Sequence, residues 1–248
     1  MSLSTQPIIG HLSLPDLLAL LWLLGCWGGY AWYAERGQRA RQGLVGLGHE
    51  HRLQWARCLL KREVRIVDAS LIGNLMSSVS FYANTTIYII AGMFAVLGTL
   101  DKLISVTADL PFARPASRDL LEIKLMLLCA IFVVAYFKFT WSLRQFNLLS
   151  ILVGAAPQPE ETTPADRERY AQKMAAVNTH AGDEFNRGIR AYYFGLATLS
   201  WILSPWLQMI VTGSIVAVLY LRDFASPTRA ALADELPSQS PLEKPADQ

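Results

Sequence analysis

The residues best placed for chemistry lie between positions 74 and 88, where hydrogen-bonding side chains recur at helical spacing inside a long apolar stretch. At about 100° per residue, one helix face holds Asn74, Ser77, Ser78, Phe81, Asn84, Thr85 and Tyr88, with Ser80 at its edge. The opposite face holds Leu71, Ile72, Leu75, Met76, Val79 and Ile87. Hydrocarbon neither accepts nor donates hydrogen bonds, so we expect this polar stripe to face protein or water.

Two interpretations of the polar stripe stay open on the sequence. The first is helix packing, because Ser, Thr and Asn allow close helix contact and hydrogen-bond across it. The second is a water-lined pathway or solute site, because pores use hydroxyl, amide and carbonyl groups in place of hydration. In the pathway interpretation a homo-oligomer brings copies of the stripe together, since one small bundle leaves little room for an internal pore.

Three basic residues are candidates for contact with an anion or a lipid headgroup. Lys138 lies about one turn inside a predicted span, where it either extends to the membrane boundary or acts as a buried charge. Arg187 and Arg190 lie one turn apart, and they either hold a phosphate through bidentate contacts or anchor the helix at the boundary.

Metal-ligating and nucleophilic residues are sparse. His180 and Glu184 have the i, i+4 spacing of a helical metal site, but a pair alone supplies too few ligands. The three cysteines, Cys26, Cys58 and Cys129, are far apart and fit neither a metal nor a disulfide pattern. We find no Gly-rich phosphate loop, nucleophile elbow, metalloprotease motif or haem motif. The sequence therefore predicts no enzyme, no metal and no cofactor.

Four further charged residues have simpler explanations. Glu122 and Lys124 lie near the outer end of a predicted span, where long side chains extend to the boundary. Arg65 and Asp68 are three residues apart and can pair along one helix.

The elements that position these residues follow from composition. Of the 248 residues, 52% are hydrophobic and 17% are charged, below the roughly 25% that is usual in soluble domains. The net charge of +2 is too small to indicate a nucleic-acid partner. About 20 apolar residues in a helix cross a bilayer. We therefore predict an all-α, polytopic membrane bundle, a single domain over residues 1–224 with about four transmembrane helices at residues 13–33, 69–98, 120–142 and 191–221.

The last apolar run, residues 191–221, is too long for one untilted span, and Pro205 lies in its middle. Proline removes a backbone donor and clashes one turn back, so we expect one long helix kinked at Pro205. The alternative is two short spans, five in all, which would place the C-terminus on the other side of the membrane.

The polar segments set the orientation. Residues 34–66 and 143–190 together carry 14 Lys and Arg, against six in residues 1–12, 100–119 and 222–248. The positive-inside rule then makes the two basic segments cytoplasmic and, with four spans, places both termini outside. Arg222 and Arg229 fit this poorly and keep the five-span alternative open.

Three further segments have distinct patterns. From His51 onward the first basic segment indicates a basic amphipathic helix, which either lies on an anionic leaflet or belongs to a solvated loop. Residues 165–190 indicate a polar helix that leads into the last apolar run. Residues 225–248 form an acidic tail rich in Pro, Ala and Ser, which predicts disorder.

Several different short motifs follow one another along residues 10–225. They are Arg65-Ile-Val-Asp68, Gly73-Asn-Leu-Met76, Ser78-Val-Ser-Phe81 with Thr85-Thr86, Phe137-Lys-Phe-Thr-Trp-Ser142, Arg144-Gln-Phe-Asn147, and Phe185-Asn-Arg-Gly188 before Arg190-Ala-Tyr-Tyr193. With this set the chain resembles the uncharacterised membrane-protein family known as domain of unknown function family 599. The resemblance implies a bacterial-type multi-span membrane protein and implies no activity.

The sequence leaves two functional hypotheses. One is an oligomeric channel or small-solute and anion pathway in the bacterial inner membrane, lined by the polar stripe. The other is a non-catalytic membrane subunit or scaffold that uses the same stripe for packing. The expected partners are the lipid bilayer, further copies of the chain and a second membrane protein, with no nucleic acid.

Overall fold

A computed structural model describes residues 13–36, 43–108 and 117–233. These residues form helices and no strand, which confirms the all-α prediction. The helices are α1 (Leu14–Glu35), α3 (Leu44–Leu59), α4 (Ile66–Leu97), α5 (Leu100–Ala108), α6 (Arg118–Gly154), α7 (Pro164–Ser200), α8 (Pro205–Phe224) and α9 (Pro227–Ala233), with a short 3-10 turn η2 (Pro159–Glu161).

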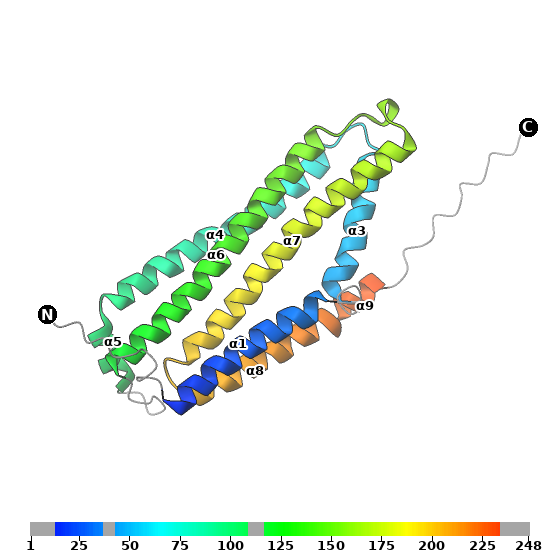
Figure 1. Ribbon diagram of the computed structural model, residues 1–248. Helices are drawn as coiled ribbons and strands as arrows, with labels where there is room; N and C mark the ends of the chain where they lie inside the picture. Colours follow the sequence, from blue (N-terminus) through cyan, green and yellow to red (C-terminus); the bar gives the residue numbers. More distant parts are fainter. Residues whose placement is uncertain (1–12, 37–42, 109–116, 234–248) are drawn as a thin grey trace, which may run out of the picture.

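The long helices α4, α6 and α7 run side by side along the molecule (Figure 1). Helices α1 and α8 pack together along the C-terminal half of α7, and α3 packs along its N-terminal half. We call the end that holds α3 and η2 the basic end. The end that holds α5 and the turn between α7 and α8 is the opposite end.

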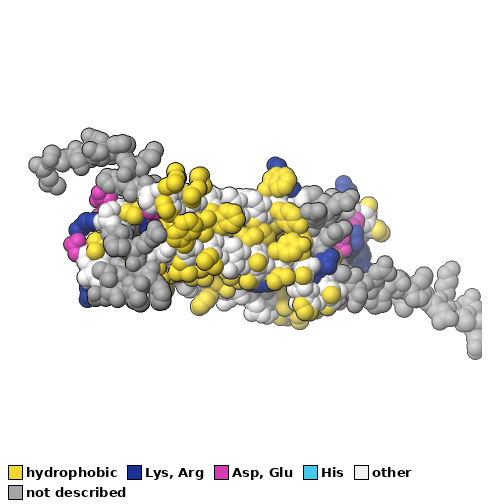
Figure 2. Space-filling model, turned by 90° about the horizontal axis from the view of Figure 1, so that it is seen from below, with side chains coloured by type: hydrophobic (Ala, Val, Ile, Leu, Met, Phe, Trp, Pro, Cys, Tyr) yellow, Lys and Arg dark blue, Asp and Glu magenta, His cyan; other side chains and the backbone are white. Residues whose placement is uncertain are grey.

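Four segments are long and apolar enough to cross a membrane: α1, α4, α6 and the segment Pro205–Leu232. Seen from below, apolar side chains cover the middle of the molecule, and charged side chains gather mostly toward its two ends (Figure 2). This distribution matches a bilayer, whose hydrocarbon core lies between two polar interfaces. The prediction of a membrane bundle with about four apolar spans is therefore confirmed.

Helix α7 is too polar to count among these four candidates, yet it occupies the centre of the bundle. It packs closely on α6 because its contact face consists of small residues. At Gly188 an added Cβ atom would lie 2.5 Å from a ring carbon of Phe139, and at Gly195 it would lie 3.1 Å from the ring of Phe132. Backbones with small residues approach closely and gain dispersion contacts, so glycine at these two positions sets the α6–α7 separation.

The prediction of one long helix kinked at Pro205 is wrong. Helix α7 ends at Ser200, and α8 begins at Pro205 and packs back against α7. Proline suits the first turn of a helix, where its missing N–H would have no intrahelical partner. Ser204 has the extended backbone of a residue that precedes a helix. The apolar run is therefore a helical hairpin, as in the five-span alternative.

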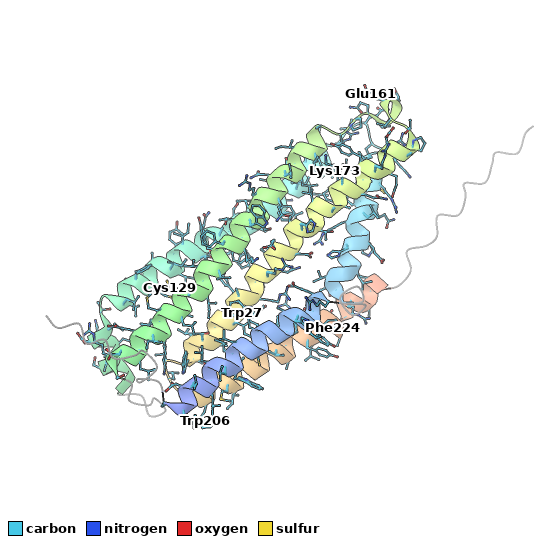
Figure 3. The ribbon with its side chains drawn as sticks, viewed as in Figure 1. Trp27, Cys129, Glu161, Lys173, Trp206 and Phe224 are labelled. Carbon is cyan, nitrogen blue, oxygen red and sulfur yellow. The ribbon has the colours of Figure 1, made fainter. Side chains whose placement is uncertain are left out.

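The hairpin changes the topology. Helices α4, α6 and α7 extend along the length of the molecule, and α1 and α8 lie along the C-terminal half of α7 (Figure 1). Trp206 and Phe224 mark the two ends of α8, with Phe224 toward the basic end (Figure 3). Ser13 therefore lies at the opposite end, whereas α9 packs on α3 at the basic end. The start of α1 and helix α9 thus lie toward opposite ends of the molecule, which fits the five-span alternative better than the expectation that both termini lie outside.

Two local expectations also change. The basic amphipathic helix exists as α3, but it begins at Leu44 and buries Gly46, Ala56 and Leu59 against α7 and its neighbours. It is thus part of the bundle. The expected disordered tail begins with a helix, α9, that packs on α3, and residues 234–248 lie outside the described residues.

Candidate functional site

Five charged side chains from three helices form a connected network where α1 ends. Glu35 accepts hydrogen bonds from Arg187 (Nη2, 2.8 Å) and from Arg190 (Nη2, 2.6 Å). Glu184 accepts a second hydrogen bond from Arg187 and forms an ion pair with Lys138 at 2.9 Å. The network joins α1, α6 and α7 at one level of the bundle, where α1 ends.

This network contains all three cations that the sequence suggested as anion or lipid contacts. Lys138, Arg187 and Arg190 each pair with a carboxylate of the same chain. An added anion would have to displace Glu35 or Glu184 from a charge-assisted hydrogen bond. The arrangement favours a role in holding the helices together.

Most of the polar stripe of α4 is exposed on the outer side of the helix. Phe81 and Tyr88 are 66% and 76% exposed. Asn74, Ser77, Ser78 and Asn84 are also exposed, and Thr85 is half-buried. The buried side of α4 instead holds Ile72, Val79, Ala83, Thr86 and Met93. Most of the stripe therefore does not pack against another helix of the same chain.

The hydroxyl groups of the stripe are partly satisfied by their own helix. Ser78 donates to the Asn74 carbonyl at 3.0 Å, and Thr85 donates to the Phe81 carbonyl at 2.8 Å. Within the part of the chain that the structure describes, the side-chain amides of Asn74 and Asn84 have no hydrogen-bond partner. The amides are thus the groups of this face that still need a partner.

The α4 hydroxyl that does cross to another helix is outside the predicted stripe. Thr86 is fully buried, and its hydroxyl lies 2.6 Å from the Tyr192 hydroxyl on α7. Tyr192 stands in a cluster of aromatic rings with Tyr82, Phe139 and Phe185, whose centroids are 5.5 to 6.0 Å apart. These edge-to-face and stacked contacts tie α4, α6 and α7 together at mid-length.

A cavity of about 490 Å³ lies between α3, α4, α6 and α7 at the basic end. Its walls are mostly apolar, and its polar lining comes from every helix around it except α6. The stripe residues Asn74 and Ser78 line it from α4, so the structure brings two of the predicted site residues into a real cavity. The lining also includes Arg52 and Trp55 of α3, Leu71, Leu75 and Val79 of α4, Phe146 of α6, and Asn178, Gly182, Phe185 and Asn186 of α7.

Arg52 is the unusual residue of this cavity. Its guanidinium lies against Gly182, where an added Cβ atom would come within 2.3 Å of Nη2. Nη1 is buried without a hydrogen-bond partner. Burial lowers the pKa of Arg52 from its ordinary value, and the charge of Asp183 opposes that shift. Arginine stays protonated at any physiological pH, so the cavity contains a charge without an ion pair.

A second cavity of about 350 Å³ lies on the other side of Arg52, between the ends of α1, α3 and α8 and the middle of α7. It is more polar and includes members of the charge network, such as Glu35 and Arg190. His49 Nε2 lies 3.1 Å from Asp183 Oδ1 in its wall. Arg52 and Asn186 line both cavities and so form the partition between them.

A buried ion pair stands at the opposite end. Lys124 Nζ lies 3.4 Å from Asp16 Oδ1 and donates to the Trp201 carbonyl at 2.9 Å. The Trp201 indole N–H donates to Asp16 at 2.8 Å. Asp16 and Lys124 are each only 4% exposed. The sequence suggested that Lys124 extends to the membrane boundary. The side chain is instead buried, and it joins α1, α6 and the α7–α8 turn.

Across residues 13–36, 43–108 and 117–233, no group of three or more His, Cys, Asp and Glu side chains lies close enough to hold a metal ion.

A family model described as "Protein of unknown function, DUF599" matches residues 18–228. The chain belongs to this family. No curated protein and no solved structure matches the chain. For this DUF599 member the arrangement of its side chains is therefore the basis for any functional conclusion.

Sequence reasoning missed the central residue of the DUF599 chain's cavity for a physical reason. Arg52 was one of eight basic residues in a segment expected to face the cytoplasm. Its burial depends on Gly182, which lies 130 positions further along the chain. The signal present in the sequence was the small-residue pattern of α7, including Ala181 and Gly182, which permits another helix to approach.

Proposed function

We propose that the protein is a non-catalytic membrane subunit that assembles with further copies of itself, with the outer face of α4 at the contact. The observation that carries the proposal is the Asn84 amide, exposed in an apolar span and without a partner among the described residues. Lipid cannot satisfy an amide, which carries two donors and an acceptor. The same amide on a second copy supplies complementary groups, and Asn side chains hydrogen-bond across membrane helices.

The side chains of this face favour contact over conduction. Ser78 and Thr85 already donate to their own backbone, so they need no water. Phe81 and Tyr88 place two large rings on the face, which suit the close packing of two helices better than the lining of a wet path. We place the assembly in the bacterial inner membrane with the basic end in the cytoplasm, following the positive-inside rule.

A pathway for a small solute or anion is the second candidate, and one observation favours it. Asn74 and Ser78 line the cavity at the basic end, so polar groups of α4 reach a space of about 490 Å³, which is large enough for a small solute. In this case the assembled copies would extend the polar lining along α4.

Substitution of Asn84 tests the subunit proposal. Asn84→Leu removes the amide and keeps the helix apolar, so we expect the oligomer of the purified protein to dissociate to monomers in micelles, measured by light scattering after gel filtration. Ser214→Leu makes a polar-to-apolar change on the exposed side of α8 and serves as the control. An assembly that survives Asn84→Leu, or a wild-type protein that is monomeric at all concentrations, contradicts the proposal.

Flux measurements separate the two candidates. In reconstituted vesicles the double variant Ser77→Leu, Asn84→Leu should leave assembly intact and abolish flux if α4 lines a pathway. The subunit function instead predicts no solute flux from the wild-type protein and loss of assembly in the variant.

A further inference from the structure

The cavity between α3, α4, α6 and α7 combines a large apolar wall with one charged end. Leu75, Val79 and Phe146 belong to its apolar wall. Arg52 and Asn178 are polar residues of its lining, and Asn178 is only 4% exposed. A volume of about 490 Å³ is within the range of small-molecule sites, which are mostly apolar with a few polar groups that orient the ligand.

The charge at the polar end, that of Arg52, has no hydrogen bond or direct ion pair among the described residues, and the carboxylate of Asp183 acts on it without direct contact. Its Nη1 is buried. A buried charge without a partner is costly. In the charge network, by contrast, the cations Lys138, Arg187 and Arg190 are each paired with a carboxylate. Arg52 is thus available to an anion in a way that these three are not.

The packing around Arg52 keeps its guanidinium in place. The group lies against Gly182, where an added Cβ atom would come within 2.3 Å of Nη2 and displace the guanidinium. A held guanidinium presents its N–H groups as a fork that matches a carboxylate or a phosphate. The guanidinium therefore suits an anionic group at one end of a ligand, and the apolar wall suits a hydrocarbon part at the other end.

The cavity opens to the outer surface of the chain beside α4. Leu71 and Leu75 on α4 line it and are 47% and 41% exposed on the outer surface of the chain. Asn186, another lining residue, is next to Arg187, which bonds to Glu35 where α1 ends. The charged end of the cavity thus lies next to the charge network, and its apolar wall lies along α4 and α6.

We propose that this cavity binds an acyl-chain amphiphile with an anionic head, with the head on Arg52 and the chain along α4 and Phe146. A fatty-acid carboxylate and a phospholipid phosphate share this chemistry. The site does not depend on the assembly proposed above, because the residues that form it come from one chain.

Quenching of Trp55, which lines the cavity, measures binding directly. The full chain is placed in nanodiscs of phosphatidylcholine and titrated with dibromostearate, or prepared with brominated phosphatidylglycerol in a separate arm. We expect a saturable component of the quenching that is lost in Trp55→Phe, above the signal of the other six tryptophans, and competition for this component by unlabelled oleate. The arm that quenches identifies the source of the anion. Methyl dibromostearate, which lacks the charge, should bind at least tenfold more weakly.

Two variants test the assigned geometry from different directions. Arg52→Gln removes the charge and Gly182→Ala keeps it but displaces the guanidinium, so each should weaken binding about tenfold or more. Arg57→Gln alters an exposed arginine of the same helix that pairs with Glu168 and does not line the cavity, and it should bind as the wild type does. Gel filtration and thermal unfolding of each variant establish that it is folded.

Several outcomes overturn the proposal. These are an absence of Trp55 quenching in both arms, wild-type affinity in Arg52→Gln, and equal binding of the methyl ester. Complete competition by inorganic phosphate alone would also overturn it, because the site would then recognise an anion without its chain.

Discussion

At the scale of single residues, several charged side chains of the described part of the chain pair across helices, whereas Arg52 has no such pair. Lys124 of α6 meets Asp16 of α1 and the carbonyl of Trp201, and Glu35 of α1 meets two arginines of α7. Each pair fixes helices that are far apart in the sequence. Spacing within one helix does not reveal such partners, which is why the sequence predicted a boundary position for Lys124 and anion contacts for Arg187 and Arg190.

Lys124 gives a direct test of such a pair. Lys124→Met leaves Asp16 buried without its cation, so we expect the free energy of unfolding to fall by about 3 kcal/mol, measured by denaturant titration in micelles. Adding Asp16→Asn removes the second charge and keeps an acceptor for the Trp201 indole, so it should recover most of the loss. Lys173→Met, on an exposed position of α7, should change stability by less than about 0.5 kcal/mol. Equal effects at positions 124 and 173 would contradict the pairing.

At the scale of helices, the sequence predicted which segments are helical better than where they end. The apolar stretches and the polar helix that leads into the last one all appear, because period and composition are local properties. Pro205 was assigned to a kink, although Ser204 and Pro205 also form a typical helix start. Which of the two occurs is decided by packing of α8 against α1 and α7, and no local pattern contains that information.

The contact between α6 and α7 depends on the absence of a side chain at Gly188. Gly188→Ala places a methyl group 2.5 Å from the buried ring of Phe139, so the helices must separate. We expect a loss of about 1–3 kcal/mol in stability, measured by denaturant titration. Gly73→Ala meets no atom within 4 Å and should be neutral or stabilising through helix propensity. Combining Gly188→Ala with Phe139→Leu should restore part of the loss, and a neutral Gly188→Ala would show that the packing is looser.

At the scale of the whole molecule, the hairpin at Pro205 decides the topology. It places α9 beside α3, at the end away from Ser13. Charge counting alone supported both topologies, because four spans accounted for the two large basic segments and left only Arg222 and Arg229 unexplained. The outward direction of the polar stripe was equally beyond the sequence, since a helical wheel orders side chains without stating what lies next to them.

Cysteine labelling tests the two-ended topology. In a variant whose native Cys26, Cys58 and Cys129 are replaced by alanine, single cysteines at Ser13 and Ala233 should react with a membrane-impermeant maleimide from opposite sides of the membrane. Labelling in right-side-out and inverted vesicles measures the side. Reaction of both positions from the same side would contradict this topology, because the chain would then cross the membrane an even number of times.

The polar composition of α7 constrains how the protein is made. A nascent helix partitions into lipid according to its own hydrophobicity, and α7 does not reach the level of the four apolar segments. When it leaves the ribosome, α1, α4 and α6 have already been synthesised, and α6 presents the rings of Phe132 and Phe139 on which the glycines of α7 pack. Its entry into the bilayer must therefore wait for this earlier part of the chain, and α8 follows as the strongly apolar arm that draws the hairpin in. Membrane insertion of this protein is accordingly a cooperative, late event for its central helix.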